Sequence, residues 1–240
     1  IDLKRQYKYL KTDILAEIKV VLENASFING PMIREVEEKL AEYIGVKHAV
    51  CCSSGTDALI LSILALDVHP GDEIIVPDFS FFATAEAVAF LGAVPVFVDI
   101  RPDTFNIDSN AITDAITENT VGIIPVSLYG QVADIDEIND IAEKEGLWVL
   151  EDAAQSYGAK YKSGYSCGLT QIGITSFFPA KPLGCYGDGG AIFTNDDKLA
   201  STLSLLLNHG QQKRYDHVLI GTNARMDSIQ AAVLKIKLKK

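Results

Sequence analysis

Long apolar runs and grouped metal ligands are both missing from this sequence of 240 residues. No stretch approaches the roughly 18 apolar residues that a membrane-spanning helix needs. The first six residues also lack the apolar segment of a signal peptide. The four histidines, His48, His69, His209 and His217, are scattered and form no H-E-x-x-H motif. The sequence therefore predicts no membrane span and no zinc site built from protein ligands.

Cysteine is scarce, and its spacing excludes the common cysteine motifs. The chain has only Cys51, Cys52, Cys167 and Cys185, and no two of them form a C-x-x-C pair. A chain of this length without a secretory signal does not need disulfides to be stable. We therefore expect four free thiols and a location in the reducing cytoplasm.

Positive charge is in deficit. Lys and Arg total 21 against 32 Asp and Glu, which gives a formal net charge of -11. A surface of this sign repels phosphate backbones, so nucleic acid is not an expected partner unless basic residues gather locally. Hydrophobic residues make up 48% and charged residues 22% of the chain. These proportions are typical of a globular protein with a large core and exclude a disordered chain or a coiled coil.

Helical and extended patterns alternate along the chain. Strands are expected over residues 48–52, 73–76, 94–98, 121–126, 147–150, 172–178 and 189–194. Helices are expected around residues 14–22, from Pro31, over 56–66, 83–91, 109–116 and 135–145, and from Met226. The strands are short and continuously apolar, which is typical of a parallel sheet covered on both faces. The alternation predicts an α/β fold with a mostly parallel sheet between two layers of helices.

Three groups of polar residues follow predicted strands, where open α/β sheets bind their ligands. The first is the turn at residues 53–59, in which Gly55 and Thr56 open a helix. A helix N-terminus offers free amide groups and a partial positive charge, which suit a phosphate. These residue types are also ordinary helix caps, so the turn alone does not establish a phosphate site. It matches neither a P-loop nor G-x-G-x-x-G.

The second and third groups supply a carboxylate and an amine. Asp152 ends an apolar strand, where it could hold the proton of a ring nitrogen or simply cap a helix. Lys181 lies between two prolines in a glycine-rich loop, where partial burial could make it a nucleophile. A single loop lysine is more often a solvated charge. The surroundings of Lys181, rather than the lysine itself, favour the chemical role.

The order of these groups matches the needs of pyridoxal phosphate: a helix end for the phosphate, a carboxylate for the ring nitrogen, and a lysine for the Schiff base. With the motifs at residues 1–3, 30–31, 55–59, 151–155 and 187–190, the chain resembles the DegT/DnrJ/EryC1/StrS family along its whole length. That resemblance implies the fold type I of pyridoxal phosphate-dependent transferases. It also implies transfer of an amino group to a keto group on a nucleotide-linked sugar.

The resemblance implies roles for individual residues. Lys181 matches the lysine that forms the Schiff base, and Asp152 matches the partner of the pyridine nitrogen. These two are the expected catalytic residues. Gly55 and Thr56 match the cradle of the cofactor's phosphate, and Ser176 matches a further phosphate ligand.

Three further cofactor contacts follow from the same resemblance. Phe81 falls where the family places an aromatic ring over the cofactor, although Phe79, Phe81 and Phe82 could all be core residues and the sequence does not choose among them. Gln155 matches a residue near the phenolic oxygen of the cofactor. Asn223 matches a residue that reaches the phosphate bound by the neighbouring subunit, so we expect a homodimer with shared active sites.

The tract at residues 175–191 is especially similar to family members that aminate UDP-2-acetamido-2-deoxy-3-oxo-D-glucuronate for a surface polysaccharide such as lipopolysaccharide. We expect the same keto sugar here, with glutamate as the amino donor. Arg225 is the expected ligand of the sugar's carboxylate, because a guanidinium can donate two parallel hydrogen bonds to it. An ion pair between Arg225 and Asp227 or another acid is the structural alternative.

Residues 1–240 are expected to form the large cofactor-binding domain with its N-terminal helices. The resemblance implies that family members continue into a small C-terminal domain, which we do not expect within residues 1–240. Four other functions stay open: amination of another 3- or 4-keto nucleotide sugar, a non-catalytic regulatory or sugar-binding role, a dehydratase of the same fold, and a nicotinamide-dependent sugar oxidoreductase. Lys181 argues against the dehydratase, which usually has histidine there. The missing glycine fingerprint disfavours a nicotinamide-dependent oxidoreductase.

Overall fold

The structure is a computed structural model, and it describes residues 1–162 and 164–239. The helices are α1 (Leu3–Glu23), α2 (Pro31–Ile44), α3 (Gly55–Ala65), α4 (Ala83–Phe90), α5 (Ser109–Ala115), α6 (Ile135–Glu145), α7 (Asp197–Leu206) and α8 (Ser228–Lys237). The main sheet contains β1 (His48–Cys52), β2 (Glu73–Pro77), β3 (Val94–Val98), β4 (Thr120–Ile123), β5 (Trp148–Asp152), β8 (Ile172–Ser176) and β9 (Gly190–Thr194). Smaller elements are η1 (Leu128–Gly130) and the hairpins β6 (Lys160–Tyr161) with β7 (Gly164–Tyr165) and β10 (Gln211–Lys213) with β11 (Asp216–His217).

The strands of the main sheet lie in the order β1-β9-β8-β5-β4-β2-β3. Strand β9 is antiparallel to both of its neighbours, β1 and β8, and all the other pairs are parallel. The predicted mostly parallel sheet is therefore confirmed. Because β1, β8, β5 and β2 run in one direction, their carboxyl ends meet at the same edge of the sheet.

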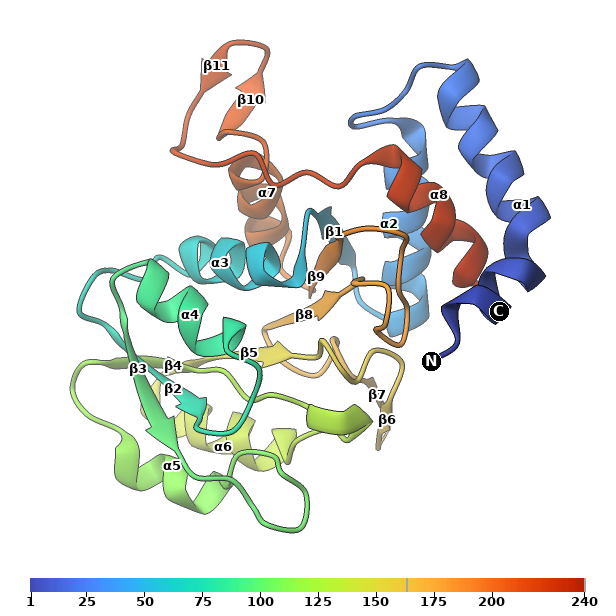
Figure 1. The fold of residues 1–240 in the computed structure, drawn as a ribbon. Helices are drawn as coiled ribbons and strands as arrows, with labels where there is room; N and C mark the ends of the chain where they lie inside the picture. The colour runs from blue at the N-terminus through green and yellow to red at the C-terminus, as the bar shows by residue number, and fades with distance from the viewer. Residues whose placement is uncertain (163, 240) are drawn as a thin grey trace.

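Helices cover both faces of this sheet (Figure 1). Successive residues of a strand face opposite sides, so Val50 and Cys52 pack in the core beneath α3, α4 and α7, while Ala49 and Cys51 pack toward α2 and α8. A third cluster joins the outer strands to α5 and α6. Each apolar run thus supplies buried side chains to both faces of the sheet. A parallel sheet covered by helices on both faces requires this.

Pro125 shortens one predicted strand. Regular pairing of β4 ends at Ile123 instead of the expected residue 126, because a proline has no amide proton for a neighbouring strand. Pairing resumes at a single bridge between Val126 and Asp152. The residues that follow, including η1, lie at the same sheet edge as the end of β5.

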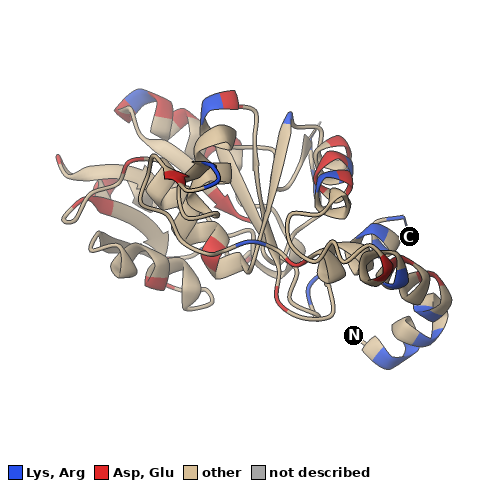
Figure 2. Cartoon of the chain, turned by 90° about the horizontal axis from the view of Figure 1, so that it is seen from above, with Lys and Arg blue, Asp and Glu red and all other residues tan. Residues whose placement is uncertain are grey.

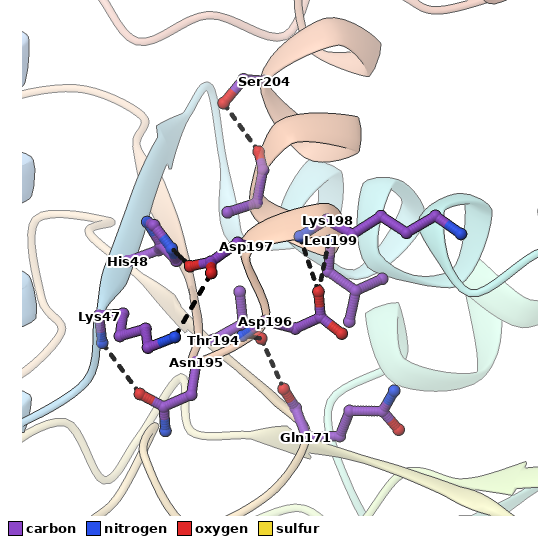
Figure 3. A network of polar contacts seen from close by, with 11 residues as sticks. Lys47, His48, Gln171, Thr194, Asn195, Asp196, Asp197, Lys198, Leu199 and Ser204 are labelled. Atoms are coloured by element: carbon purple, nitrogen blue, oxygen red, sulfur yellow. Dashed lines mark hydrogen bonds and ion pairs between the residues drawn. The ribbon is translucent and has the colours of Figure 1, made fainter.

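Helix α7 and the two hairpins were not predicted from the sequence. Asp196 caps α7 by accepting hydrogen bonds from the amides of Lys198 (2.7 Å) and Leu199 (3.0 Å) (Figure 3). The next residue, Asp197, accepts from His48 Nε2 at 2.7 Å and pairs with Lys47 Nζ at 3.4 Å. These contacts tie the start of α7 to the start of β1.

The composition-based expectations can be compared with the described residues. All four cysteines are buried free thiols, as expected. Among the residues described, no helix is long and apolar enough to cross a membrane, and no three His, Cys, Asp or Glu side chains gather as a metal site. Figure 2 shows basic residues gathered on α1, where Lys4, Arg5, Lys8 and Lys11 are exposed.

Candidate functional site

A cavity of about 780 Å³ lies at the sheet edge where the carboxyl ends of β1, β2, β5 and β8 meet. It brings together residues that are far apart in the sequence. Seven of the expected site residues line it: Gly55, Thr56, Phe81, Asp152, Gln155, Ser176 and Lys181.

One end of the cavity is formed by the N-terminus of α3. Ser54 caps this helix by accepting a hydrogen bond from the Asp57 amide at 3.0 Å, which leaves the first two amides, those of Gly55 and Thr56, for an anion. A Cβ atom on Gly55 would lie 2.8 Å from Ser176 Cβ. Only glycine allows the helix end to approach β8 this closely.

Gly190 also helps to shape the site, although the sequence analysis predicts no role for it. A Cβ atom there would lie 2.4 Å from the carbonyl oxygen of Ser54. The start of β9 can therefore pass directly behind the turn that opens α3. The pair Gly189-Gly190 in the sequence indicates that another segment passes close to the backbone there. Only the tertiary structure shows that this segment is the turn at Ser54.

Asp152 also lines the cavity. It is 5% exposed, and its carboxylate accepts hydrogen bonds from Thr84 Oγ1 at 2.9 Å and from the Ala154 amide at 3.1 Å. Burial raises the pKa of Asp152, whereas these two donors and the positive charge of Lys181 lower it. The site thus holds a fixed, desolvated carboxyl group that a cationic ligand would stabilise in its charged form.

Thr84 was not predicted to contribute, because it is 68 residues from Asp152 along the chain. Thr84 lies in the first turn of α4, and no sequence motif marks it as a site residue. Its hydroxyl fixes one oxygen of Asp152 and thereby orients the carboxylate.

The acidic pair at the end of β5 divides between two environments. Unlike Asp152, Glu151 does not line the cavity and is fully buried. It accepts hydrogen bonds from Ser127 Oγ (2.7 Å), Ser166 Oγ (2.6 Å) and the Cys167 amide (2.8 Å). Burial raises the pKa of Glu151 as well. Since adjacent strand residues face opposite sides, only Asp152 is available to a ligand.

Lys181 belongs to the loop between β8 and β9. It is partly buried and lines the cavity, and its amide donates to the Phe178 carbonyl at 2.9 Å. Ser176 Oγ, at the end of β8, accepts from the Phe178 amide at 3.2 Å. Its hydroxyl proton therefore stays available to a ligand near the start of α3.

The structure decides among the three phenylalanines. Phe79, Phe81 and Phe82 are all exposed, which rules out the alternative that they are core residues. Only Phe81 of the three lines the cavity, as the resemblance implies. The Phe79 ring instead packs against Phe105, with their centroids 5.8 Å apart.

Gln155 and Tyr129 lie next to each other at the cavity wall. Gln155 Oε1 accepts a hydrogen bond from the Tyr129 amide at 3.0 Å, which leaves the amide NH2 group of Gln155 as a donor. Tyr129 lines the cavity and was not predicted. Its φ of 54° is a left-handed conformation that a non-glycine residue rarely adopts, and such residues are often found at functional sites.

Asn223 and Arg225 do not line the cavity of their own chain. Arg225 donates from Nη1 to Asn208 Oδ1 at 2.5 Å, and its Nε is buried without a hydrogen-bond partner among the described residues. Among the described residues it forms no ion pair with Asp227 or another acid, which was the structural alternative. Asn223 is exposed and bridges Asn208 in the backbone.

These residues fit the parts of pyridoxal phosphate. The amides at the start of α3 suit a phosphate, and the buried carboxylate of Asp152 suits a protonated ring nitrogen. Ser80 Oγ also lines the cavity and is buried without a protein partner among the described residues, so it has a hydrogen bond to offer a polar ligand. With Lys181 on the same cavity, this is the class of site found in pyridoxal phosphate enzymes.

The chain belongs to the DegT/DnrJ/EryC1/StrS aminotransferase family, whose profile matches residues 8–240. The family depends on pyridoxal phosphate, which confirms the expected class of cofactor. The fold is that of the family's solved structures. One of them, NtdA from Bacillus subtilis with the bound cofactor PMP, matches with a TM-score of 0.90 and 38% identity. That match covers 95% of this chain and 52% of the NtdA chain.

Two relatives of this chain are named for different functions, one as an enzyme and one as a regulatory protein. The UDP-2-acetamido-2-deoxy-3-oxo-D-glucuronate aminotransferase of Pseudomonas aeruginosa is 54% identical over 100% of this chain and 67% of its own length. A pleiotropic regulatory protein of Geobacillus stearothermophilus is 46% identical over 99% of this chain and 64% of its own length. The chain therefore spans about two thirds of the length of these relatives.

Proposed function

We propose that this protein is a pyridoxal phosphate-dependent aminotransferase that moves an amino group from glutamate to a keto group of a nucleotide-linked sugar. The convergence of Lys181, Asp152 and the start of α3 on one cavity carries this proposal. As substrate we propose UDP-2-acetamido-3-oxo-glucuronate, destined for a surface polysaccharide. The identity of 54% with the Pseudomonas aeruginosa enzyme supports that choice.

When bound, pyridoxal phosphate supplies an electron sink and a carrier for the amino group. Gly55, Thr56 and Ser176 would hold its phosphate, and Asp152 would keep a proton on its ring nitrogen. Thr84 keeps the Asp152 carboxylate in place for that task.

Lys181 has two tasks in this proposal. At rest its Nζ would bond the cofactor covalently. As a free amine, the same Nζ would act as the general base that takes the proton from the donor's α-carbon. Phe81 would flank the ring, and Gln155 would donate to its phenolic oxygen. Because one amino group is transferred before the second substrate reacts, ping-pong kinetics are expected.

Covalent labelling tests the proposal directly. The protein incubated with pyridoxal phosphate should turn yellow, and borohydride should fix the cofactor on Lys181, because that amine lines the cavity. Peptide mapping by mass spectrometry identifies the labelled lysine. Lys181→Ala should take up no label, and a label on any other lysine of the native protein would contradict the assignment.

A non-catalytic role is the second candidate, favoured by the name of the Geobacillus stearothermophilus relative. A protein with only a binding or regulatory role would need no nucleophile, yet Lys181 lines the cavity beside Asp152. Adding glutamate to the cofactor-loaded protein before the borohydride separates the two candidates, because an aminotransferase would convert the cofactor to its aminated form and lose the label on Lys181, whereas a binding protein would keep the label. We also propose a cytoplasmic location, in keeping with the four buried free thiols.

We further propose a homodimer in which each chain contributes Asn223 and Arg225 to the neighbouring site. Both residues lie outside the cavity of their own chain, and Arg225 Nε is buried without a partner among the described residues. In an extended segment, residues two apart face the same side, so Asn223 and Arg225 could reach one target. Asn223 would contact the cofactor's phosphate, and Arg225 would bind the carboxylate of the uronate.

Arg225→Met should lower kcat/KM for the uronate by about 10- to 150-fold, because charge-assisted hydrogen bonds are worth roughly 1.5–3 kcal/mol. Kinetics with the uronate and with a keto sugar lacking the carboxylate measure this effect. Cofactor absorbance and the reaction with glutamate should stay unchanged. Equal losses on both sugars, or loss of the cofactor, would assign Arg225 a structural role instead.

A further inference from the structure

Two side chains of α8 contact the backbone of the loop that carries Lys181. Gln230 Oε1 accepts a hydrogen bond from the Tyr186 amide at 2.9 Å, and Gln230 Nε2 donates to the Tyr186 carbonyl at 3.4 Å. A Cβ atom on Gly187 would lie 2.7 Å from Gln230 Nε2, so the side chain packs directly on the loop. The side chain of Gln230 therefore binds both the backbone amide and the backbone carbonyl of Tyr186.

Lys237 lies seven residues after Gln230 on the same face of α8, and it contacts the same loop. Its Nζ donates to the Gly184 carbonyl and lies 5.1 Å from the centre of the Tyr186 ring. Lys237 is 8% exposed and takes part in no ion pair among the described residues. Burial lowers the pKa of Lys237, because no carboxylate among the described residues pairs with its ammonium group to compensate the lost water.

A lysine buried in this way lowers the stability of the fold. An ammonium group buried without a carboxylate loses hydration that one carbonyl and one ring replace only in part. Lys235, two residues earlier on α8, shows the ordinary arrangement. Its Nζ pairs with Glu17 at 3.0 Å and Glu35 at 2.9 Å, which joins α8 to α1 and α2. Helix packing explains Lys235 but does not require Lys237.

The position of Gly184 is coupled to that of Lys181 through the backbone. A Cβ atom on Gly184 would lie 2.5 Å from the Pro179 carbonyl oxygen and 2.7 Å from that of Phe178. The Phe178 carbonyl in turn accepts the hydrogen bond from the Lys181 amide at 2.9 Å. A displacement of Gly184 would therefore shift the turn from which Lys181 enters the cavity.

We propose that Lys237 and Gln230 are positioning residues that fix the Lys181 loop, so that α8 determines where the amine of Lys181 stands in the cavity. The inference rests on the proposed function, since it assigns to α8 a part in cofactor capture. Neither side chain lines the cavity or would touch the cofactor. Both act through the backbone of residues 184–187.

The test compares Lys237→Met and Gln230→Leu with Lys235→Met as the matched control on the same helix. Three quantities are measured on the full chain: the rate of covalent capture of pyridoxal phosphate, hydrogen–deuterium exchange of the loop at residues 182–188, and Tm. Lys237→Met should slow capture by about 10- to 100-fold, the effect of losing one hydrogen bond from a charged donor. Loop exchange should accelerate in both Lys237→Met and Gln230→Leu.

Lys235→Met should lower Tm yet leave the capture rate and the loop exchange as in the native protein. Native capture in both Lys237→Met and Gln230→Leu would overturn the inference, even if their Tm fell. Gln230→Leu keeps the test decisive if Lys237→Met does not fold. Failure of the native protein to capture the cofactor at Lys181 would instead contradict the proposed function, so the two failures are distinguishable.

Discussion

Asp152→Asn is expected to lower kcat by about 200- to 5,000-fold, because removing one partner of a buried ion pair costs about 3–5 kcal/mol and each 1.36 kcal/mol is tenfold in rate. The neutral amide has the same shape but cannot hold a proton on the ring nitrogen. The hydrogen bonds from Thr84 and Ala154 are directed at a carboxylate in the native protein. Steady-state kinetics with saturating cofactor measure the loss.

The pH dependence of cofactor binding gives a second measurement on the same variant. Burial raises the pKa of Asp152, so lowering the pH protonates the carboxyl of the free protein more readily than that of an ordinary aspartate. Affinity for pyridoxal phosphate should therefore fall as the pH drops through that raised pKa in the native protein. In Asp152→Asn this part of the pH dependence should vanish, because the amide does not titrate.

Glu151→Gln is the matched control, since Glu151 is the neighbouring buried acid on the same strand. Its hydrogen bonds go to Ser127, Ser166 and Cys167 and not into the cavity. The variant should retain the cofactor's absorbance and most of the turnover, whatever it does to stability. A large loss in Glu151→Gln with native turnover in Asp152→Asn would reverse the assignment of the two acids.

The sheet could be predicted from the sequence because its strands are continuous apolar runs bounded by turns. The departures have separate causes. Pro125 interrupts β4. Asp196 caps α7 through local hydrogen bonds, whereas Asp197 pairs with Lys47 and His48 near the start of β1, which no local pattern shows. The hairpins β6–β7 and β10–β11 have strands of only two or three residues, too short for any periodicity to show.

The sequence could place Asp152 at the end of an apolar strand and Lys181 in a glycine-rich loop after another, and the structure brings both residues to one cavity. The site could not be predicted where the contact depends on the packing of distant elements. Thr84 reaches Asp152 because α4 follows β2 at the same sheet edge, and no local pattern marks it. The choice of Phe81 over Phe79 likewise depends on the turn between β2 and α4, which points one ring at the cavity and the other at Phe105.

Mixing two inactive variants is expected to restore turnover if the sites are shared. Lys181→Ala alone should have no measurable turnover, since it lacks the amine that bonds the cofactor. The double variant Asn223→Ala/Arg225→Met keeps its own cavity but should lose about 10²- to 10⁴-fold, the product of two lost charge-assisted contacts. Neither parent can form a complete site in a dimer with itself.

A mixed dimer differs from both parents in having one complete site. The cavity of the double variant keeps Lys181, and it receives the intact Asn223 and Arg225 from the Lys181→Ala chain. Random exchange makes about half of the dimers mixed, and one of their two sites works, so the mixture should regain about a quarter of native turnover. Turnover is measured after subunit exchange has been verified with chains of different mass.

Lys181→Ala mixed with Asp152→Asn is the control that separates sharing from a general effect of mixing. Both residues line one cavity of the same chain, so every site in that mixture lacks one of them and no recovery is expected. Recovery there would mean that the two residues do not act in one cavity. No recovery with the double variant, despite verified exchange, would mean that Asn223 and Arg225 act only within their own chain, where the Asn208 contact of Arg225 would be their structural role.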